Sequence, residues 1–269
     1  MSVEKPALWN SSDAYDRYMG RWSRKAAPLF LNWLDAPAEN SWVYMGCGSD
    51  GLTHQIATNC SPSQLLGIDS PEGFLKAAKG QVPSAEFRVG SAVELEIPDS
   101  SMDFAVCGLV LNFVPAGGKV ISEMAHIVRP GGTVASYVWD YAGHTPIMRC
   151  FFDAALAIDT GASAFDDGVN APICRPQPLK DAFGFAGLVD VETTAIDIPT
   201  PFVDFDDYWS PFMGGTGSAP RYCMSLEDSV RNQIETSIQA KLPTGPDGEI
   251  LLAARAWAVK GTVRNLIVV

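Results

Sequence analysis

The feature that most constrains the fold is an apolar run that breaks into a glycine turn at residues 41–53, SWVYMGCGSDGLT. Trp42 to Met45 is typical of a buried strand. Gly46 and Gly48 permit a tight turn that a side chain would block, and helical spacing resumes at Leu52. A strand, a glycine turn and a helix start together predict a place where backbone N–H groups and a helix dipole meet a nucleotide-like ligand.

A second apolar run predicts the next strand. Leu65 to Ile68 ends in Asp69, a carboxylate that follows the glycine turn by about 20 residues. A doubly wound fold places an acid on ribose hydroxyls at this distance. The ends of both strands are therefore expected to face one ligand.

Strand and helix patterns alternate further along the chain. Ser70 fits the N-cap of a helix, and helical spacing also covers 116–128, where Arg129-Pro130-Gly131-Gly132 is expected to stop the helix. Further strands are predicted at 85–89, 102–109 and 133–139, which gives five strands with four intervening helices. Such alternation requires a parallel sheet, and ligand-binding residues collect at the carboxyl ends of its strands.

The segment before the first strand is aromatic and mostly helical in spacing. From Asp13 to Leu34 the spacing is interrupted by Gly20 and Pro28, which predicts two helices with a bend. We expect a lid over the glycine turn, with Arg17 or Arg21 available to meet a carboxylate. The alternative is that Trp22 and Trp33 plug the sheet edge, which we favour for Trp33.

The charge balance limits the classes of partner. The chain has 19 Lys and Arg against 31 Asp and Glu, a formal charge of -12. Nucleic acids and anionic membranes are bound by clustered basic residues, so we expect neither as a partner. A neutral or cationic small substrate fits more easily. The plainer interpretation, which we favour, is that the acidity only keeps the protein soluble.

Cysteine usage and targeting signals indicate the compartment. The six cysteines are scattered without a CxxC pair, and no histidine stands at metal-ligand spacing, so we expect reduced thiols and no metal site. The first ten residues lack an apolar core behind a basic start, and no apolar run approaches membrane-spanning length. The expected location is the cytoplasm.

Four blocks together resemble a known family, the class I S-adenosylmethionine-dependent methyltransferases, of the small-molecule type related to ubiquinone and menaquinone biosynthesis enzymes. The blocks are GCGSDGLT at 46–53, LLGIDSPEGFLKAAK at 65–79, FRVGSAVELEIPDSSMDFAVCGLVLNFV at 87–114 and EMAHIVRPGGTVASYVWDY at 123–141. The likeness covers about Tyr15 to Tyr141, and the RPGG segment before the fifth strand is among its most specific parts.

The resemblance implies an α/β fold with a seven-stranded, mostly parallel Rossmann-like sheet. Its strand order is 3-2-1-4-5-7-6, with strand 7 antiparallel, and 189–198 and 250–259 fit the last two strands by their alternation. The implied organisation is an N-terminal helical lid at 1–40, a methyltransferase core at 41–260 with insertions 145–187 and 199–243 as an acceptor-side cap, and a tail at 261–269. The tail is expected to be either a frayed end or a homodimer contact.

The resemblance also assigns binding roles for S-adenosylmethionine. Gly46 and Gly48, with Cys47 between them, border the methionine part, and Asp69, followed by Ser70, takes the ribose hydroxyls. Ser91 and Ala92 flank adenine, and Leu109 to Asn112 line the path between sulfonium and acceptor. From the predicted lid, Tyr18 and Arg21 complete the expected cofactor site.

Three positions depart from the family pattern. The family usually has an acid where this chain has Tyr44, a glycine where it has Asp50, and an aspartate where it has Ser91. Losing one charge-assisted hydrogen bond costs about 1.5–3 kcal/mol, so two losses weaken binding by a few powers of ten unless they are compensated. The Tyr44 hydroxyl, accepting from the cofactor's ammonium, and the Ser91 hydroxyl, accepting through a water, are candidate compensations.

Methyl transfer needs an aligned acceptor, exclusion of water and, for a protonated nucleophile, a base. Asp140, Tyr141 and His144, after the fifth strand, are the candidate catalytic residues, and histidine is the residue type most often used as a base near neutral pH. The alternative for His144 is a solvent-exposed helix start.

We place the acceptor pocket among the aromatic residues of the second insertion. The alternative, favoured for Phe205 and Phe212, is that these residues form the insertion's own core. The aromatic residues are Phe202, Phe205, Tyr208, Trp209, Phe212 and Tyr222.

The expected activity is methyl transfer from S-adenosylmethionine to a small, apolar or aromatic acceptor. One alternative is a protein of the same fold that binds a ligand or partner without methylating it, which the altered Tyr44, Asp50 and Ser91 would explain. Another is a non-methylating reaction on the same scaffold, with Asp140 or His144 as base. A dehydrogenase is disfavoured, since the turn lacks the third glycine of the nicotinamide fingerprint.

Overall fold

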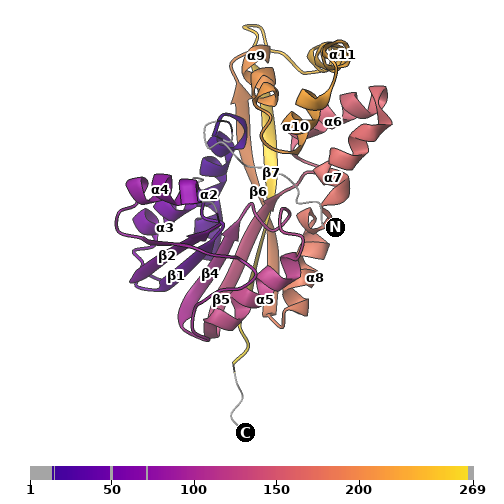
Figure 1. Ribbon diagram of the computed structural model, residues 1–269. Helices are drawn as coiled ribbons and strands as arrows, with labels where there is room; N and C mark the ends of the chain where they lie inside the picture. Colours follow the sequence, from indigo (N-terminus) through magenta and orange to yellow (C-terminus); the bar gives the residue numbers. More distant parts are fainter. Residues whose placement is uncertain (1–13, 15, 49–50, 71, 266–269) are drawn as a thin grey trace. The chain divides into compact units, whose positions relative to one another are not determined.

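The computed structural model describes residue 14 and residues 16–48, 51–70 and 72–265 (Figure 1). Within these residues one sheet has the strand order β3-β2-β1-β4-β5-β7-β6. Strands β1 to β5 pair in parallel, whereas β7 runs antiparallel to β5. The strands are β1 (Ser41–Met45), β2 (Gln64–Asp69), β3 (Glu86–Val89), β4 (Met102–Gly108), β5 (Val128–Trp139), β6 (Val189–Phe202) and β7 (Ile250–Thr262).

Helices connect these strands and fill the two insertions. The α-helices are α2 (Arg21–Leu34), α3 (Leu52–Asn59), α4 (Glu72–Gln81), α5 (Gly117–Ile127), α6 (Pro146–Ile158), α7 (Asp167–Asn170), α8 (Pro176–Phe185), α9 (Phe205–Trp209), α10 (Ser218–Ser225) and α11 (Asp228–Gln239). A π-helix, η1, spans Asp16–Gly20, and 3-10 helices are η2 (Thr160–Phe165), η3 (Pro172–Cys174) and η4 (Ser210–Gly214).

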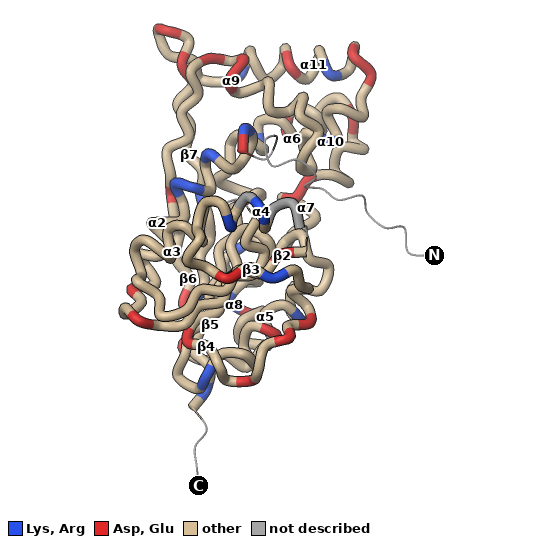
Figure 2. Tube along the Cα trace, turned by 60° about the vertical axis from the view of Figure 1, so that its left-hand side comes forward, with Lys and Arg blue, Asp and Glu red and all other residues tan. Residues whose placement is uncertain are grey.

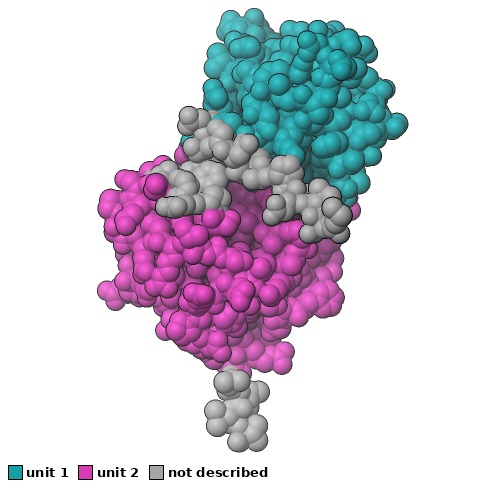
Figure 3. All heavy atoms as spheres, in the orientation of Figure 1, with its two compact units in different colours: residues 1–22, 140–172, 197–255 teal, residues 23–139, 173–196, 256–269 magenta. Residues whose placement is uncertain are grey.

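The chain divides into two compact units (Figure 3). Unit 1 comprises residues 1–22, 140–172 and 197–255, and unit 2 comprises residues 23–139, 173–196 and 256–269. Strands β6 and β7 contribute residues to both units. The predicted N-terminal lid is likewise shared, since η1 belongs to unit 1 and nearly all of α2 to unit 2.

Unit 2 is built around a sheet covered by helices. Figure 1 shows α3 and α4 on one side of its strands and α5 and α8 on the other. Every residue of β4 is buried, as expected for a central parallel strand with both faces covered. The Trp42 ring stacks on that of Phe104 in the neighbouring strand, with ring centroids 4.3 Å apart. Parallel pairing of β1 with β2 and with β4 places the carboxyl ends of these three strands at one edge of the sheet.

The predicted strand order and the antiparallel seventh strand are confirmed. Two details were wrong. The RPGG segment does not precede the fifth strand but lies within it, because β5 begins at Val128, and its register with β4 shifts between Met102 and Phe104. The count of four intervening helices fails as well, since residues 90–101 connect β3 to β4 by turns and contain no helix.

In the N-terminal segment the π-helix ends at Gly20 and α2 begins at Arg21. Pro28 does not interrupt α2, which continues through it to Leu34. Trp33 in unit 2 is half-buried beneath the Lys260 ammonium, which lies 4.7 Å from the ring centroid. Trp22 in unit 1 packs edge-on against Phe202.

The surface carries the acidic balance of the sequence. Figure 2 shows acidic residues at α9, α11 and α5, with lysine and arginine residues interspersed among them in this view. All six cysteines are described, and each is a free thiol. None of the described helices is both long and apolar enough to cross a bilayer.

Candidate functional site

The glycine turn after β1 needs glycine at Gly46 for two reasons. Its φ of 69° lies in the left-handed region, and a Cβ added there would lie 2.5 Å from Cγ2 of Val110. The N–H groups of Gly46 and Cys47 donate to the carbonyl of Ile68, at 2.8 and 3.2 Å. The turn is therefore fixed between β2 and the loop after β4.

Gly46→Ala should lower the free energy of unfolding by about 2–4 kcal/mol, because it adds left-handed strain to overpacking against Val110. Gly80→Ala is the matched control: nothing lies within 4 Å of the added methyl group in α4, so we expect stabilisation of up to about 1 kcal/mol. Urea unfolding of both variants measures the difference. Equal effects on stability would contradict the packing described for Gly46.

Asp69 lies directly against this turn. Its Oδ2 accepts a hydrogen bond from the Gly48 N–H at 2.7 Å, and its Oδ1 accepts from the Ser70 N–H at 2.7 Å. Burial raises the pKa of the Asp69 carboxyl, while the two N–H donors act to lower it. The parallel register, which pairs Met45 with Ile68, brings the carboxylate to the glycine turn.

The third strand end reaches the same edge. The Gly90 N–H donates to the Asp69 carbonyl at 3.0 Å, so Ser91 is one residue from a direct contact with Asp69. Ser91 is exposed, and its hydroxyl accepts from the Val93 N–H at 3.3 Å. Ala92, between Ser91 and Val93, is half-buried.

The other predicted residues of this unit play different parts. Tyr44 is completely buried within β1. The Cys47 thiol lies near Gly67 of β2, where an added Cβ would be 3.0 Å from its Sγ. Cys47 thus directs its thiol toward β2. Leu109 has a φ of 59°, unusual for a residue with a side chain, and its N–H donates to the Tyr137 carbonyl at 2.8 Å. Asp50 lies outside the described residues.

Two predicted cofactor residues, Tyr18 and Arg21, belong to unit 1. The carboxylate that Arg21 meets is Asp207, at 2.7 Å, and its guanidinium lies over the rings of Trp22 and Phe202. The Tyr18 hydroxyl is buried without a hydrogen-bond partner among the described residues, and burial raises its pKa. Their part in cofactor binding stays a prediction.

The candidate catalytic residues follow β5 in unit 1. Asp140 is buried, its Oδ1 accepts from the Gly143 N–H at 3.0 Å, and its Oδ2 lies 3.3 Å from Nδ1 of His144. The His144 side chain is 68% exposed, so the carboxylate can orient an imidazole that solvent reaches. Tyr141, in contrast, is buried, and its carbonyl is the group that makes a polar contact with Arg149.

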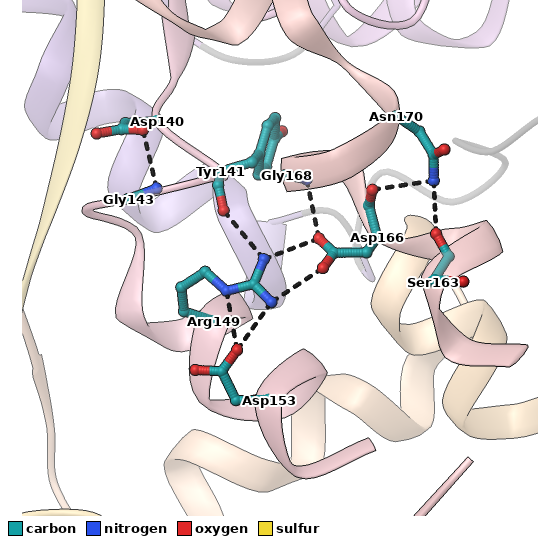
Figure 4. Close-up of polar contacts among 9 residues, drawn as sticks. All are labelled: Asp140, Tyr141, Gly143, Arg149, Asp153, Ser163, Asp166, Gly168 and Asn170. Atoms are coloured by element: carbon teal, nitrogen blue, oxygen red, sulfur yellow. Dashed lines mark hydrogen bonds and ion pairs between the residues drawn. The ribbon is translucent and has the colours of Figure 1, made fainter. Parts of the chain in front are cut away.

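Arg149 of α6 anchors this loop, and no sequence pattern predicted it (Figure 4). Its guanidinium makes two 2.9 Å bonds to the two carboxylate oxygens of Asp166, which is 2% exposed. It also donates to Asp153 at 3.0 and 3.2 Å and to the Tyr141 carbonyl at 3.4 Å. Asp166 caps α7 by accepting from the Gly168 N–H. The ion pair with Asp166 thus joins α6 to the start of α7, and the bond to the Tyr141 carbonyl joins the loop after β5 to α6.

The aromatic residues of the second insertion pack on one another. The Phe212 ring stacks on Phe151 with centroids 4.8 Å apart, and the Tyr208 hydroxyl donates to the Ile147 carbonyl at 2.8 Å. The Tyr222 hydroxyl donates to Asp159 at 2.8 Å. These rings form the core of unit 1, as the alternative interpretation expected for Phe212.

A parallel sheet with a glycine turn after β1 and an acid after β2 defines a Rossmann-like α/β fold. Residues 43–136 match the family model for a methyltransferase domain. This match, together with named methyltransferase relatives and structural neighbours, supports a class I S-adenosylmethionine-dependent methyltransferase.

Named relatives agree with this family. A trans-aconitate 2-methyltransferase of Variovorax paradoxus is 26% identical over 254 residues, 91% of this chain and 94% of the relative. A demethylmenaquinone methyltransferase of Lysinibacillus sphaericus is 27% identical over 161 residues, 55% of this chain and 68% of the relative. Among solved structures, the YcgJ protein of Bacillus subtilis matches with a TM-score of 0.60 at 15% identity, covering 90% of this chain and 99% of that one. This last likeness concerns the fold alone.

Proposed function

We propose that this methyltransferase moves a methyl group from S-adenosylmethionine to a small, apolar or aromatic acceptor in the cytoplasm. The observation that carries the proposal is the Asp69 carboxylate, held by two backbone N–H groups against Gly48. A fixed acceptor pair at a strand end suits two adjacent ribose hydroxyls. The names of the relatives specify acceptors of different chemistry, so they do not select one.

The residues at this edge fit the cofactor. Gly48 leaves backbone without a side chain where the methionine part would approach, while the space beside Gly46 is filled by Val110. Asp69 would hold the ribose. Ser91 would flank adenine, because it follows Gly90, whose N–H donates to the Asp69 carbonyl. Leu109 would line the path to the acceptor.

Bound S-adenosylmethionine supplies an electrophilic methyl group on its sulfonium. The chain must align the acceptor in line with that bond and exclude water. Where the acceptor atom carries a proton, His144 would take it at the nitrogen that does not face Asp140, and the Asp140 carboxylate would orient the ring. Arg149 would keep this loop in place through the Tyr141 carbonyl.

Ser91→Asp should tighten binding of S-adenosylhomocysteine roughly tenfold or more, because a carboxylate at this exposed position can accept from the adenine amine. Ser91→Asn, of similar size but without charge, is the control and should change affinity less. Isothermal titration calorimetry measures both. Equal or weaker binding in the aspartate variant would contradict the account of this position.

The proposed function is tested by calorimetry of the full chain with S-adenosylmethionine and S-adenosylhomocysteine. We expect saturable heat with both, at micromolar to high micromolar concentration. No heat at several hundred micromolar ligand would refute methyl transfer. It would favour the second candidate, a protein of this fold that binds another ligand or catalyses a non-methylating reaction.

Two observations favour that second candidate. Tyr44 is completely buried in β1, and the Ser91 hydroxyl is engaged by its own turn. Neither residue therefore offers the charged contact that the family usually has there. Asp69 alone keeps a familiar acidic position.

A further inference from the structure

The side chain of Asn112 is an unusual feature of unit 2. Both its Nδ2 and its Oδ1 are buried, and neither has a hydrogen-bond partner among the described residues. Asn112 thus leaves a buried donor and a buried acceptor together. Native proteins seldom bury such groups without a partner, so each case requires an explanation.

The local backbone does not explain the burial. The Phe113 N–H donates to the Val110 carbonyl at 2.8 Å, which places Asn112 at the third position of a turn. Asparagine is common in turns because its side chain bonds nearby backbone or reaches water. The Asn112 amide does neither within the described residues. Its burial therefore points to a role outside the turn.

The same loop contacts the proposed cofactor edge. Leu109 adopts a left-handed backbone conformation, which is costly for a residue with a side chain and is found preferentially at functional sites. Val110 lies against Gly46, so closely that no methyl group would fit between them. Asn112 is two residues beyond this contact. The unpaired amide thus lies in the loop that meets the glycine turn.

We propose that the Asn112 carboxamide is the recognition group for the methyl acceptor. Its Oδ1 accepts from an N–H or O–H of the acceptor, and its Nδ2 donates to an adjacent carbonyl oxygen. The acceptor is therefore a planar compound in which a donor lies next to a carbonyl, as in a lactam. This assignment rests on the proposed function and narrows its acceptor class.

Stability tests the unpaired amide independently of any ligand. Asn112→Leu replaces it with an apolar side chain of similar size, and we expect the melting temperature to rise by about 2–4 °C. Asn40, half-buried in the same unit, is the control because its Nδ2 donates to the Pro37 carbonyl at 2.6 Å. Asn40→Leu should lower the melting temperature. A fall in both variants would show that the Asn112 amide is already satisfied, which would overturn the proposal.

Binding tests the recognition role. In the presence of saturating S-adenosylhomocysteine, we expect the full chain to bind 2-quinolinone at least about tenfold more tightly than quinoline, which lacks the lactam pair. Asn112→Leu should abolish this preference. A preference that is absent in the natural protein, or that survives in Asn112→Leu, would overturn the proposal.

Failure of the proposed function is distinguishable from failure of this inference. If S-adenosylhomocysteine does not bind the natural protein, methyl transfer is refuted. The two probes are then compared without it, and the same preference and the same loss in Asn112→Leu are required. If S-adenosylhomocysteine binds the natural protein, the preference between the two probes and its loss in Asn112→Leu judge only the role of Asn112.

Discussion

Asp69→Ala should abolish measurable binding of S-adenosylhomocysteine, a loss of at least about 100-fold. The carboxylate is the proposed partner of two ribose hydroxyls, and each charge-assisted hydrogen bond contributes about 1.5–3 kcal/mol. The substitution also removes the acceptor for the Gly48 and Ser70 N–H groups. Isothermal titration calorimetry measures the loss. A signal that survives in Asp69→Ala would place the ligand elsewhere on the protein.

Two further variants separate binding from folding. Asp69→Asn keeps one oxygen that can accept from the Gly48 N–H but has no charge. Because burial raises the pKa of Asp69, its ionised form at pH 7 costs folding free energy, and stability from this group is lost as the pH rises through that pKa. Asp69→Asn should therefore bind weakly without melting lower at pH 7. Glu86→Ala, at an exposed position at the start of β3, should leave binding unchanged.

Arg149→Met should lower the free energy of unfolding by about 3–5 kcal/mol. The Asp166 side chain is 2% exposed, and the substitution leaves its carboxylate without a cation. A buried charge that loses its partner lowers the free energy of unfolding. It also removes the bond to the Tyr141 carbonyl. Urea unfolding, followed by circular dichroism, measures the change in midpoint.

The control for Arg149 is a second bidentate pair in the same unit. Arg255 bonds both oxygens of Asp197, at 2.7 and 2.8 Å, but the Asp197 side chain is 56% exposed. Arg255→Met should therefore cost less than about 1 kcal/mol. Adding Asp166→Asn to Arg149→Met should recover part of the loss, because the buried charge is gone. Equal costs for the two arginine variants would show that burial of Asp166 does not set the effect.

The binding edge of unit 2 was predictable because it follows from sheet geometry. Once the glycine turn and Asp69 were placed at the ends of successive parallel strands, the register had to bring them together, and Gly48 and Asp69 are hydrogen-bonded. The strand order followed from the family resemblance. The start of β5 could not be predicted in this way, because glycine and proline in RPGG indicate a turn. The strand begins before these residues, and its register with β4 shifts.

Residues that depend on tertiary packing could not be predicted. Arg149 and Asp166 lie 17 residues apart in an insertion. No sequence periodicity links a residue within one helix, α6, to the N-cap residue of a later helix, α7. Asn112 was predicted only as part of a segment lining the acceptor path, because an unpaired amide is visible only when its surroundings are known. The aromatic residues fitted both a pocket and a core by composition, and the ring contacts of Phe212 with Phe151 and Tyr208 place Phe212 in the core.

The most direct test of the central claim, that Asp69 and the glycine turn form the adenosyl site, is calorimetry with S-adenosylhomocysteine as the pH is lowered. Burial holds the pKa of Asp69 above its ordinary value of 3.8, so affinity should begin to fall at a higher pH than an exposed aspartate would require. In Asp69→Asn the remaining weak binding should lack this decline. An identical pH dependence in both proteins, with equal affinity at pH 7, would contradict the account.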